Sequence, residues 1–126
     1  MILGTGIDIV KNARLESWLD SEKLLERFFH PDEVLCVKEK GKSALQSLAA
    51  RFAAKEAFAK ALGTGFKDFS LKEICVKNSP FGKPELFVYG KALEAENRIG
   101  ADKIHLSLSH ESEYTIAMVI LEKTGD

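Results

Sequence analysis

The spacing of apolar residues along the chain predicts two dominant elements, a strand near the N-terminus and a long helix in the middle. In residues 2–10 (ILGTGIDIV) the alternation places Ile7 and Ile9 on one face of a strand and Asp8 with two glycines on the other. Residues 43–65 are rich in Ala and Leu, contain no Pro and end in glycines, which is typical of a helix of several turns. Little of this helix is polar, so we expect it to be almost wholly enclosed.

The remaining segments predict shorter elements around that helix. In chain order these are two helical pieces within residues 11–29, a helix from 31 to about 40 capped by His30, strands at 70–77 and 85–89, a polar helix at 91–98 and a closing hairpin at 103–121. The last strand of the hairpin is apolar enough to lie at the centre of the sheet. We therefore expect a single domain, residues 1–126, of the α+β class, in which an antiparallel-rich sheet packs against the long central helix.

Composition narrows the class of protein without identifying a function. The chain is 45% hydrophobic and 29% charged, which is ordinary for a globular domain of 126 residues with a real core. A net charge of −1 favours neither nucleic acid nor a membrane as a partner, and no apolar run approaches transmembrane length. Cys36 and Cys75 have no metal-ligand spacing, and we interpret both as reduced core residues. A cytoplasmic location is expected, since no signal peptide is recognisable.

Two acidic residues stand where the pattern predicts burial. Glu56 falls only roughly 20° from Leu45 on a helical wheel, so a carboxylate interrupts the apolar stripe of the long helix. Burial of a carboxylate is costly unless a cation compensates, and Lys60 one turn later, a metal ion or both would do so. Plain alternatives stay open: Glu56 reaches water or pairs only with Lys60, and Asp8 lies at a sheet edge.

Read together, Asp8 and Glu56 indicate a cation site. Two hard oxygen donors that converge between a strand and a helix suit Mg²⁺, which joins a few carboxylates to substrate phosphates. Positive or donor groups that we expect around them are Arg51, Lys55, Lys60, Lys83, His105 and His110. This combination suits a polyphosphate substrate and chemistry of the phosphoryl-transfer type.

The sequence resembles the 4′-phosphopantetheinyl transferases, in particular their short type, the holo-(acyl-carrier-protein) synthases. Four motifs carry the resemblance in the family's order: Gly6-Ile7-Asp8, the run RFAAKEAFAKALGTG at 51–65, Gly82-Lys83-Pro84 and HLSLSH at 105–110. They span nearly the whole chain, and FxxKExxxK followed by SLSH is specific. The resemblance implies the 4′-phosphopantetheinyl transferase fold. It also implies Mg²⁺-dependent transfer of 4′-phosphopantetheine from coenzyme A to a serine of apo-acyl carrier protein, which releases adenosine 3′,5′-bisphosphate.

The resemblance further implies roles for individual residues. Asp8 and Glu56 match the family's Mg²⁺ ligands and, with Lys60 beside the pyrophosphate, make up the implied catalytic set. The positions that match coenzyme A contacts are Arg51, Lys60, Gly63, Lys83, Pro84, His105, Ser109 and His110. Arg14 matches a contact to acyl carrier protein and Arg27 is expected to act likewise, which suits an acidic partner.

Three further expectations concern the base, the assembly and an alternative. Candidates for the base that takes the serine proton are Glu56, Glu111 and a water on the metal. Val10 stands where larger members of the superfamily place a third acid, so the third metal ligand is expected to be water. The short type forms homotrimers with active sites at subunit interfaces. The alternative function is a non-catalytic coenzyme A- or nucleotide-binding domain, which would not need both acids.

Overall fold

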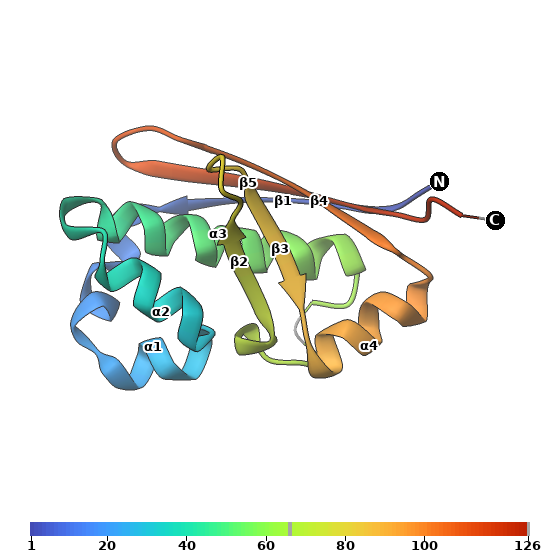
Figure 1. Ribbon diagram of the computed structural model, residues 1–126, viewed down its shortest axis with the longest axis horizontal. Helices are drawn as coiled ribbons and strands as arrows, with labels where there is room; N and C mark the ends of the chain where they lie inside the picture. Colours follow the sequence, from blue (N-terminus) through green and yellow to red (C-terminus); the bar gives the residue numbers. More distant parts are fainter. Residues whose placement is uncertain (66, 126) are drawn as a thin grey trace.

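The predicted central helix is present as α3 (Ala44–Leu62), and the other elements are arranged around it (Figure 1). The computed structural model describes residues 1–65 and 67–125, so Phe66 and Asp126 lie outside the described residues. Gly63 ends α3 in the left-handed conformation with φ of 81°, which a glycine adopts without strain. Twelve residues of α3 are buried, as its apolar composition predicts: Leu48, Ala49, Arg51, Phe52, Ala53, Ala54, Lys55, Ala57, Phe58, Ala59, Ala61 and Leu62.

The other elements follow the predicted order closely. Before α3 come β1 (Ile2–Lys11), η1 (Asn12–Asp20), α1 (Glu22–Phe28), α2 (Pro31–Lys38) and η2 (Gly41–Ser43), where η marks a 3₁₀-helix. After α3 come η3 (Leu71–Glu73), β2 (Ile74–Asn78), β3 (Pro84–Val88), α4 (Gly90–Ile99), β4 (Lys103–His110) and β5 (Tyr114–Glu122). His30 caps α2 as predicted, since its side chain accepts a hydrogen bond from the Asp32 amide at 3.1 Å.

The strands form two antiparallel sheets rather than one. The larger sheet has the order β1-β5-β4, which confirms β5 as the central strand, and the smaller sheet pairs β2 with β3. The predicted strand at 70–77 is wrong for its first residues. Ser70 and Glu73 form a capping box there, so the chain makes a 3₁₀ turn before β2 begins at Ile74.

The three-stranded sheet has one face on α3 and one face free. Its inner face is closed by the buried side chains of Val10, Thr115, Ala117, Val119 and Leu121. In Figure 1 the sheet runs along the top with α3 directly beneath it, while the β2–β3 hairpin crosses α3 in this view and its turn reaches the level of the sheet. Helix α4 lies at one end of α3, and η1, α1 and α2 lie at the other.

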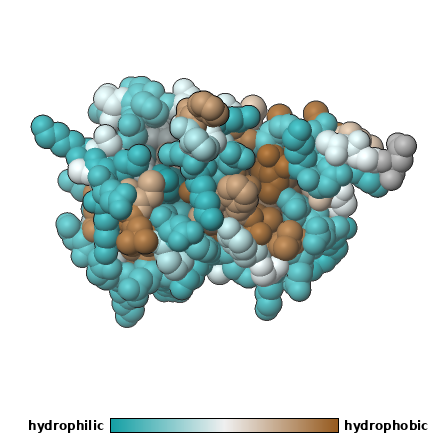
Figure 2. Space-filling view, in the orientation of Figure 1, coloured by the Kyte–Doolittle hydropathy of each residue, from teal (hydrophilic) through white to brown (hydrophobic). Residues whose placement is uncertain are grey.

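The outer face of the sheet is apolar and exposed. The exposed fractions are 62% for Ile7, 59% for Ile9, 37% for Ile116 and 42% for Met118. Register places Ile7 opposite Met118 and Ile9 opposite Ile116, so these side chains form one continuous surface, called here the outer sheet face. By contrast, the face that carries α1, α2 and α4 is largely hydrophilic with separate apolar patches (Figure 2). Within residues 1–65 and 67–125, the helices are too short or too polar to cross a bilayer.

Candidate active site

Asp8 and Lys60 meet where β1 crosses the C-terminal half of α3. Asp8 points to the inner face of β1, and its side chain is only 14% exposed. The Lys60 ammonium donates to Asp8 Oδ1 at 3.0 Å and to the Ile7 carbonyl oxygen at 3.0 Å. The positive charge of Lys60 therefore lies directly beside the negative charge of Asp8, and the two attract each other.

Glu56 belongs to the same group of charges. Its side chain is half-buried, one helical turn before Lys60. Desolvation raises the pKa of Glu56, and the nearby Asp8 carboxylate raises it further, while Lys60 and Arg14 act in the opposite direction. The Glu56 carboxylate thus lies within electrostatic reach of Asp8, and their joint binding of a cation stays a prediction.

The chemistry of this cluster fits a divalent cation. Two carboxylates supply hard oxygen ligands, and Mg²⁺ commonly completes its octahedron with water and substrate phosphate oxygens. Among the described residues no group of three or more His, Cys, Asp or Glu side chains gathers as a metal centre. Any ion held by Asp8 and Glu56 would therefore keep several positions for water or substrate.

A second group of predicted residues lines a small pocket between the two sheets. Lys83 and Pro84 at the start of β3 face His105 on β4 across a cavity of about 200 Å³. His105 Nε2 lies 2.8 Å from Glu122 Oε1, and this contact lowers the pKa of Glu122. The pocket therefore offers a lysine and a histidine at the β4 edge of the larger sheet.

Arg51 and His110 line another pocket, of about 280 Å³, near the N-terminal half of α3. Arg51 is 5% exposed and donates to Ser47 Oγ at 2.6 Å and toward Cys36 Sγ at 3.1 Å. Its Nε has no hydrogen-bond partner among the described residues. His110 Nδ1 lies 2.7 Å from Gln46 Nε2. Arg51 and His110 therefore give this pocket a guanidinium and an imidazole, both groups that can bind an anion.

One chain does not bring all the predicted site residues to a single place. Asp8, Glu56 and Lys60 lie at β1, which is one edge strand of the larger sheet. The pocket of Lys83 and His105 adjoins β4, the opposite edge strand. Gly63 forms the C-cap of α3, and Ser109 pairs with Ile116, which belongs to the outer sheet face. The predicted residues therefore form two half-sites, one beside each edge strand of the larger sheet.

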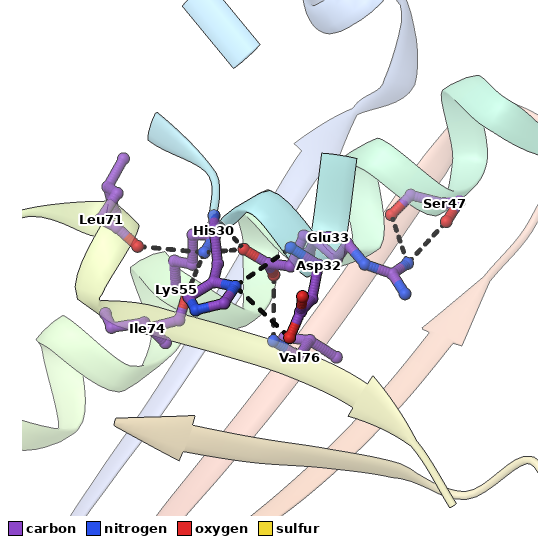
Figure 3. Close-up of polar contacts among 9 residues, drawn as sticks. His30, Asp32, Glu33, Ser47, Lys55, Leu71, Ile74 and Val76 are labelled. Atoms are coloured by element: carbon purple, nitrogen blue, oxygen red, sulfur yellow. Dashed lines mark hydrogen bonds and ion pairs between the residues drawn. The ribbon is translucent and has the colours of Figure 1, made fainter. Parts of the chain in front are cut away.

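The expectation for Lys55 is wrong, because its side chain points away from Asp8 and Glu56 into the core. Lys55 is fully buried and donates to Glu33 Oε1 at 2.5 Å, to the Leu71 carbonyl at 3.0 Å and to the Ile74 carbonyl (Figure 3). Burial lowers the pKa of Lys55, and the Glu33 charge opposes that shift. The ion pair joins α2, α3 and the beginning of β2.

Glu33 was not singled out from the sequence. It is 1% exposed, and its second carboxylate oxygen accepts the Val76 amide at 3.0 Å (Figure 3). Its only local signal was an acid in the first turn of a helix, and it does accept the His30 amide at 3.0 Å as a capping residue would. The buried partner 22 residues away could not be inferred from that local pattern.

The two arginines predicted to contact a protein partner are both exposed. Arg14 lies in η1, with its guanidinium carbon 6.0 Å from the ring centre of Phe52. Arg27 lies in α1, with its guanidinium carbon 5.1 Å from the ring centre of Phe28. Aromatic support of this kind fixes each guanidinium at the surface while leaving its donors to a partner.

Comparisons with known proteins agree with the motifs. The sequence model of the 4′-phosphopantetheinyl transferase superfamily matches residues 4–119. The holo-[acyl-carrier-protein] synthase of Treponema denticola is 54% identical over 122 residues, which cover 97% of this chain and 99% of that protein.

Solved structures give the same relationship. The holo-[acyl-carrier-protein] synthase of Neisseria meningitidis is 39% identical with a TM-score of 0.87, over 98% of this chain and all (100%) of that one. The enzyme of that name from Bacillus anthracis, solved in complex with CoA (3′,5′-ADP), is 40% identical with a TM-score of 0.82, over 98% and 99% of the two chains.

Proposed function

The chain belongs to the 4′-phosphopantetheinyl transferase superfamily, and we propose that it transfers 4′-phosphopantetheine from coenzyme A to a serine of apo-acyl carrier protein. The products are holo-acyl carrier protein and adenosine 3′,5′-bisphosphate. The observation that carries this proposal is the convergence of Asp8, Glu56 and Lys60 in a chain that matches the family from end to end. A domain that only bound coenzyme A would not need two carboxylates close together, because they repel each other and the phosphates of the ligand unless a cation lies between them.

Asp8 and Glu56 are the residues that would hold Mg²⁺. When bound there, the ion supplies charge neutralisation for the pyrophosphate of coenzyme A. Lys60 is positioned to bind the same pyrophosphate, since its side chain is 54% exposed while its ammonium donates to β1. In the reaction the serine oxygen forms a bond to the β-phosphorus, and the bond from that phosphorus to the bridging oxygen breaks. Lys60 stabilises the negative charge that develops on the departing nucleotide phosphate.

The serine must also lose a proton, and Glu111 is poorly placed to take it. Glu111 Oε1 accepts the amides of Glu113 at 2.7 Å and Tyr114 at 2.8 Å, so it shapes the β4–β5 turn. Glu56 and a water molecule remain the better candidates.

The two pockets beside β4 hold the proposed coenzyme A contacts. Lys83, Pro84 and His105 line one pocket and Arg51 with His110 the other, so each offers cationic or donor groups to a phosphate. Ser109 extends this surface along β4, and Gly63 belongs to the half-site at the end of α3. Arg14 and Arg27 are the proposed contacts for an acidic acyl carrier protein.

We also propose that the protein acts as a homotrimer with active sites between subunits. Two observations support an assembly. The outer sheet face is apolar and exposed in the single chain, and the two half-sites lie at opposite edges of the sheet. A second copy could place its β4 pockets against the Asp8 cluster of the first. A cytoplasmic location is proposed because the described chain carries two free cysteines, Cys36 and Cys75, which suit a reducing compartment.

The test is the intact mass of an apo-acyl carrier protein after incubation with this protein, coenzyme A and Mg²⁺. Wild type is expected to add one phosphopantetheine group, and both a chelator and Glu56→Gln are expected to abolish the gain. If wild type produces no gain with several carrier proteins but still binds coenzyme A, the non-catalytic binding domain becomes the better description.

A further inference from the structure

We propose that Gly6 is a positioning residue that sets the separation of Asp8 and Glu56. It does so by allowing the backbone of β1 to lie directly on the backbone of α3. The inference rests on the proposed role of Asp8 and Glu56 as cation ligands. It adds a reason why the strand before Asp8 contains glycine.

The evidence is the space around the glycine. A methyl group built on Gly6 would lie 2.0 Å from the Ala57 carbonyl oxygen and 2.7 Å from the Ala61 amide nitrogen. Real Cβ atoms essentially never approach another heavy atom within 3.0 Å, and here both obstacles are backbone atoms. Gly6 does not have a positive φ, so glycine is needed for closeness and not for conformational freedom.

The close approach lies within the site. Ala57 and Ala61 directly follow Glu56 and Lys60 along α3, and Asp8 follows Gly6 by two residues on the same face of β1. Lys60 also donates to the carbonyl oxygen of Ile7, which ties the strand to the helix at the same level. The contact at Gly6 therefore controls the gap that separates the two carboxylates.

A larger side chain would widen that gap. To relieve contacts of 2.0 and 2.7 Å, β1 must move from α3 by an amount on the order of 1 Å, because the opposing helix backbone cannot rotate aside. Mg²⁺ requires oxygen ligands at about 2.0–2.1 Å in near-ideal octahedral geometry. A shift of that size takes one carboxylate out of coordination distance while leaving both residues chemically intact.

Gly4 provides an internal comparison. A methyl group there would lie 2.0 Å from the Ala61 carbonyl oxygen, so the steric conflict is of the same kind. Gly4 is four residues from Asp8, and a β-bulge between Ile2 and Gly4 lets the strand adjust there. Gly4→Ala should therefore lower stability about as much as Gly6→Ala while disturbing the carboxylates less.

The experiment measures binding of Mn²⁺, as a paramagnetic probe, in the presence of coenzyme A by electron paramagnetic resonance. Thermal unfolding of the same samples is recorded in parallel. Gly6→Ala is expected to weaken Mn²⁺ binding by roughly ten- to a hundredfold, as loss of support around metal ligands typically does. Thr5→Ala, which alters an exposed side chain of the same strand, should bind as wild type does.

A second variant distinguishes positioning from general damage. Asp8→Glu lengthens the ligand by one carbon, so it should weaken Mn²⁺ binding in the wild-type background yet partly restore it in Gly6→Ala. If Gly6→Ala does not fold in dilute buffer, the same pair of measurements is made at low temperature with sucrose, which stabilises the folded state. Wild-type affinity in the folded Gly6→Ala protein would overturn the positioning role alone. Absence of Mn²⁺ binding by wild type would overturn the proposed metal role and the inference together.

Discussion

At the scale of single residues, the buried ion pair of Lys55 and Glu33 should contribute strongly to the stability of the core. We expect Lys55→Met to destabilise the protein by about 3–5 kcal/mol, because it leaves the Glu33 carboxylate buried without its cation. Chemical denaturation with urea measures the difference. Lys42→Met, at an exposed lysine in η2, is the matched control and should change stability by less than about 0.5 kcal/mol.

The double variant Lys55→Met with Glu33→Gln completes that test. It removes both charges together, so it should be more stable than Lys55→Met alone. Equal stabilities for the single and double variants would contradict the view that an uncompensated Glu33 charge causes the loss.

The two cysteines should differ in reactivity toward iodoacetamide. Cys75 is fully buried, and its burial together with the Glu33 charge raises the pKa of its thiol to about 11. Alkylation requires the thiolate, so Cys75 stays unmodified in the native protein at pH 8. Cys36 is half-buried and is expected to react first. Mass spectrometry should find one adduct on native protein and two in urea, whereas two equally fast native adducts would refute the assignment.

At the scale of elements, the buried carboxylate of Glu96 destabilises the packing of α4 against the rest of the protein. Glu96 is 8% exposed, and burial together with the Asp102 charge raises its pKa. A carboxyl group with a raised folded-state pKa costs stability above that pKa and costs nothing below its unfolded value, where both states are protonated.

Glu96→Gln should therefore raise the melting temperature at pH 7 by about 2–4 °C. The gain should disappear as the pH falls below about 4, near the pKa of an unfolded glutamate. Differential scanning calorimetry across pH checks both statements, and Glu94→Gln on the exposed side of α4 serves as the control. A gain that persists unchanged at low pH would show that the benefit does not come from the charge.

Elements were predictable wherever their signals were local. The composition of 43–65 predicted α3, His30 with Pro31 predicted the start of α2, and the apolar final strand predicted the centre of the sheet. One local signal was overlooked before β2: Ser70 and Glu73 have the spacing of a capping box, which predicts a helical turn where a strand was expected. Local signals failed to separate the β2–β3 hairpin from the larger sheet, because strand partners are chosen by tertiary packing.

The candidate site divides in the same way. Lys60 was predictable as a neighbour of Glu56, because the two lie one helical turn apart, and the structure adds the contact of Lys60 with Asp8 on β1. The motif at 51–65 misled for Lys55, whose neighbouring position in sequence turns it about 100° around the helix and into the core. Which side chain of a helix faces the core depends on the elements packed beside it. Glu33, the partner of Lys55, lies 22 residues away in the sequence, so no local pattern predicted this pairing.

At the scale of the whole molecule, the proposed trimer accounts for the exposed apolar sheet face and for the division of the predicted site residues between two strands. Ile9 and its neighbours expose an apolar surface on the outer sheet face, and the predicted site residues are divided between the two edge strands, β1 and β4. Soluble monomers rarely leave a continuous apolar patch exposed. An assembly that covers this face would also supply the missing half of each site.

We therefore expect Ile9→Glu to dissociate the protein, because burying an unpaired carboxylate in an apolar interface is strongly unfavourable. Light scattering coupled to size exclusion should find a trimer for wild type and a monomer for the variant, and the carrier-protein mass assay should lose most of its activity. Leu35→Glu makes the same change at a 62% exposed leucine on α2 and should stay assembled and active. A folded, monomeric Ile9→Glu protein with wild-type activity would mean that a single chain completes its own site, and the two half-sites would then need another explanation.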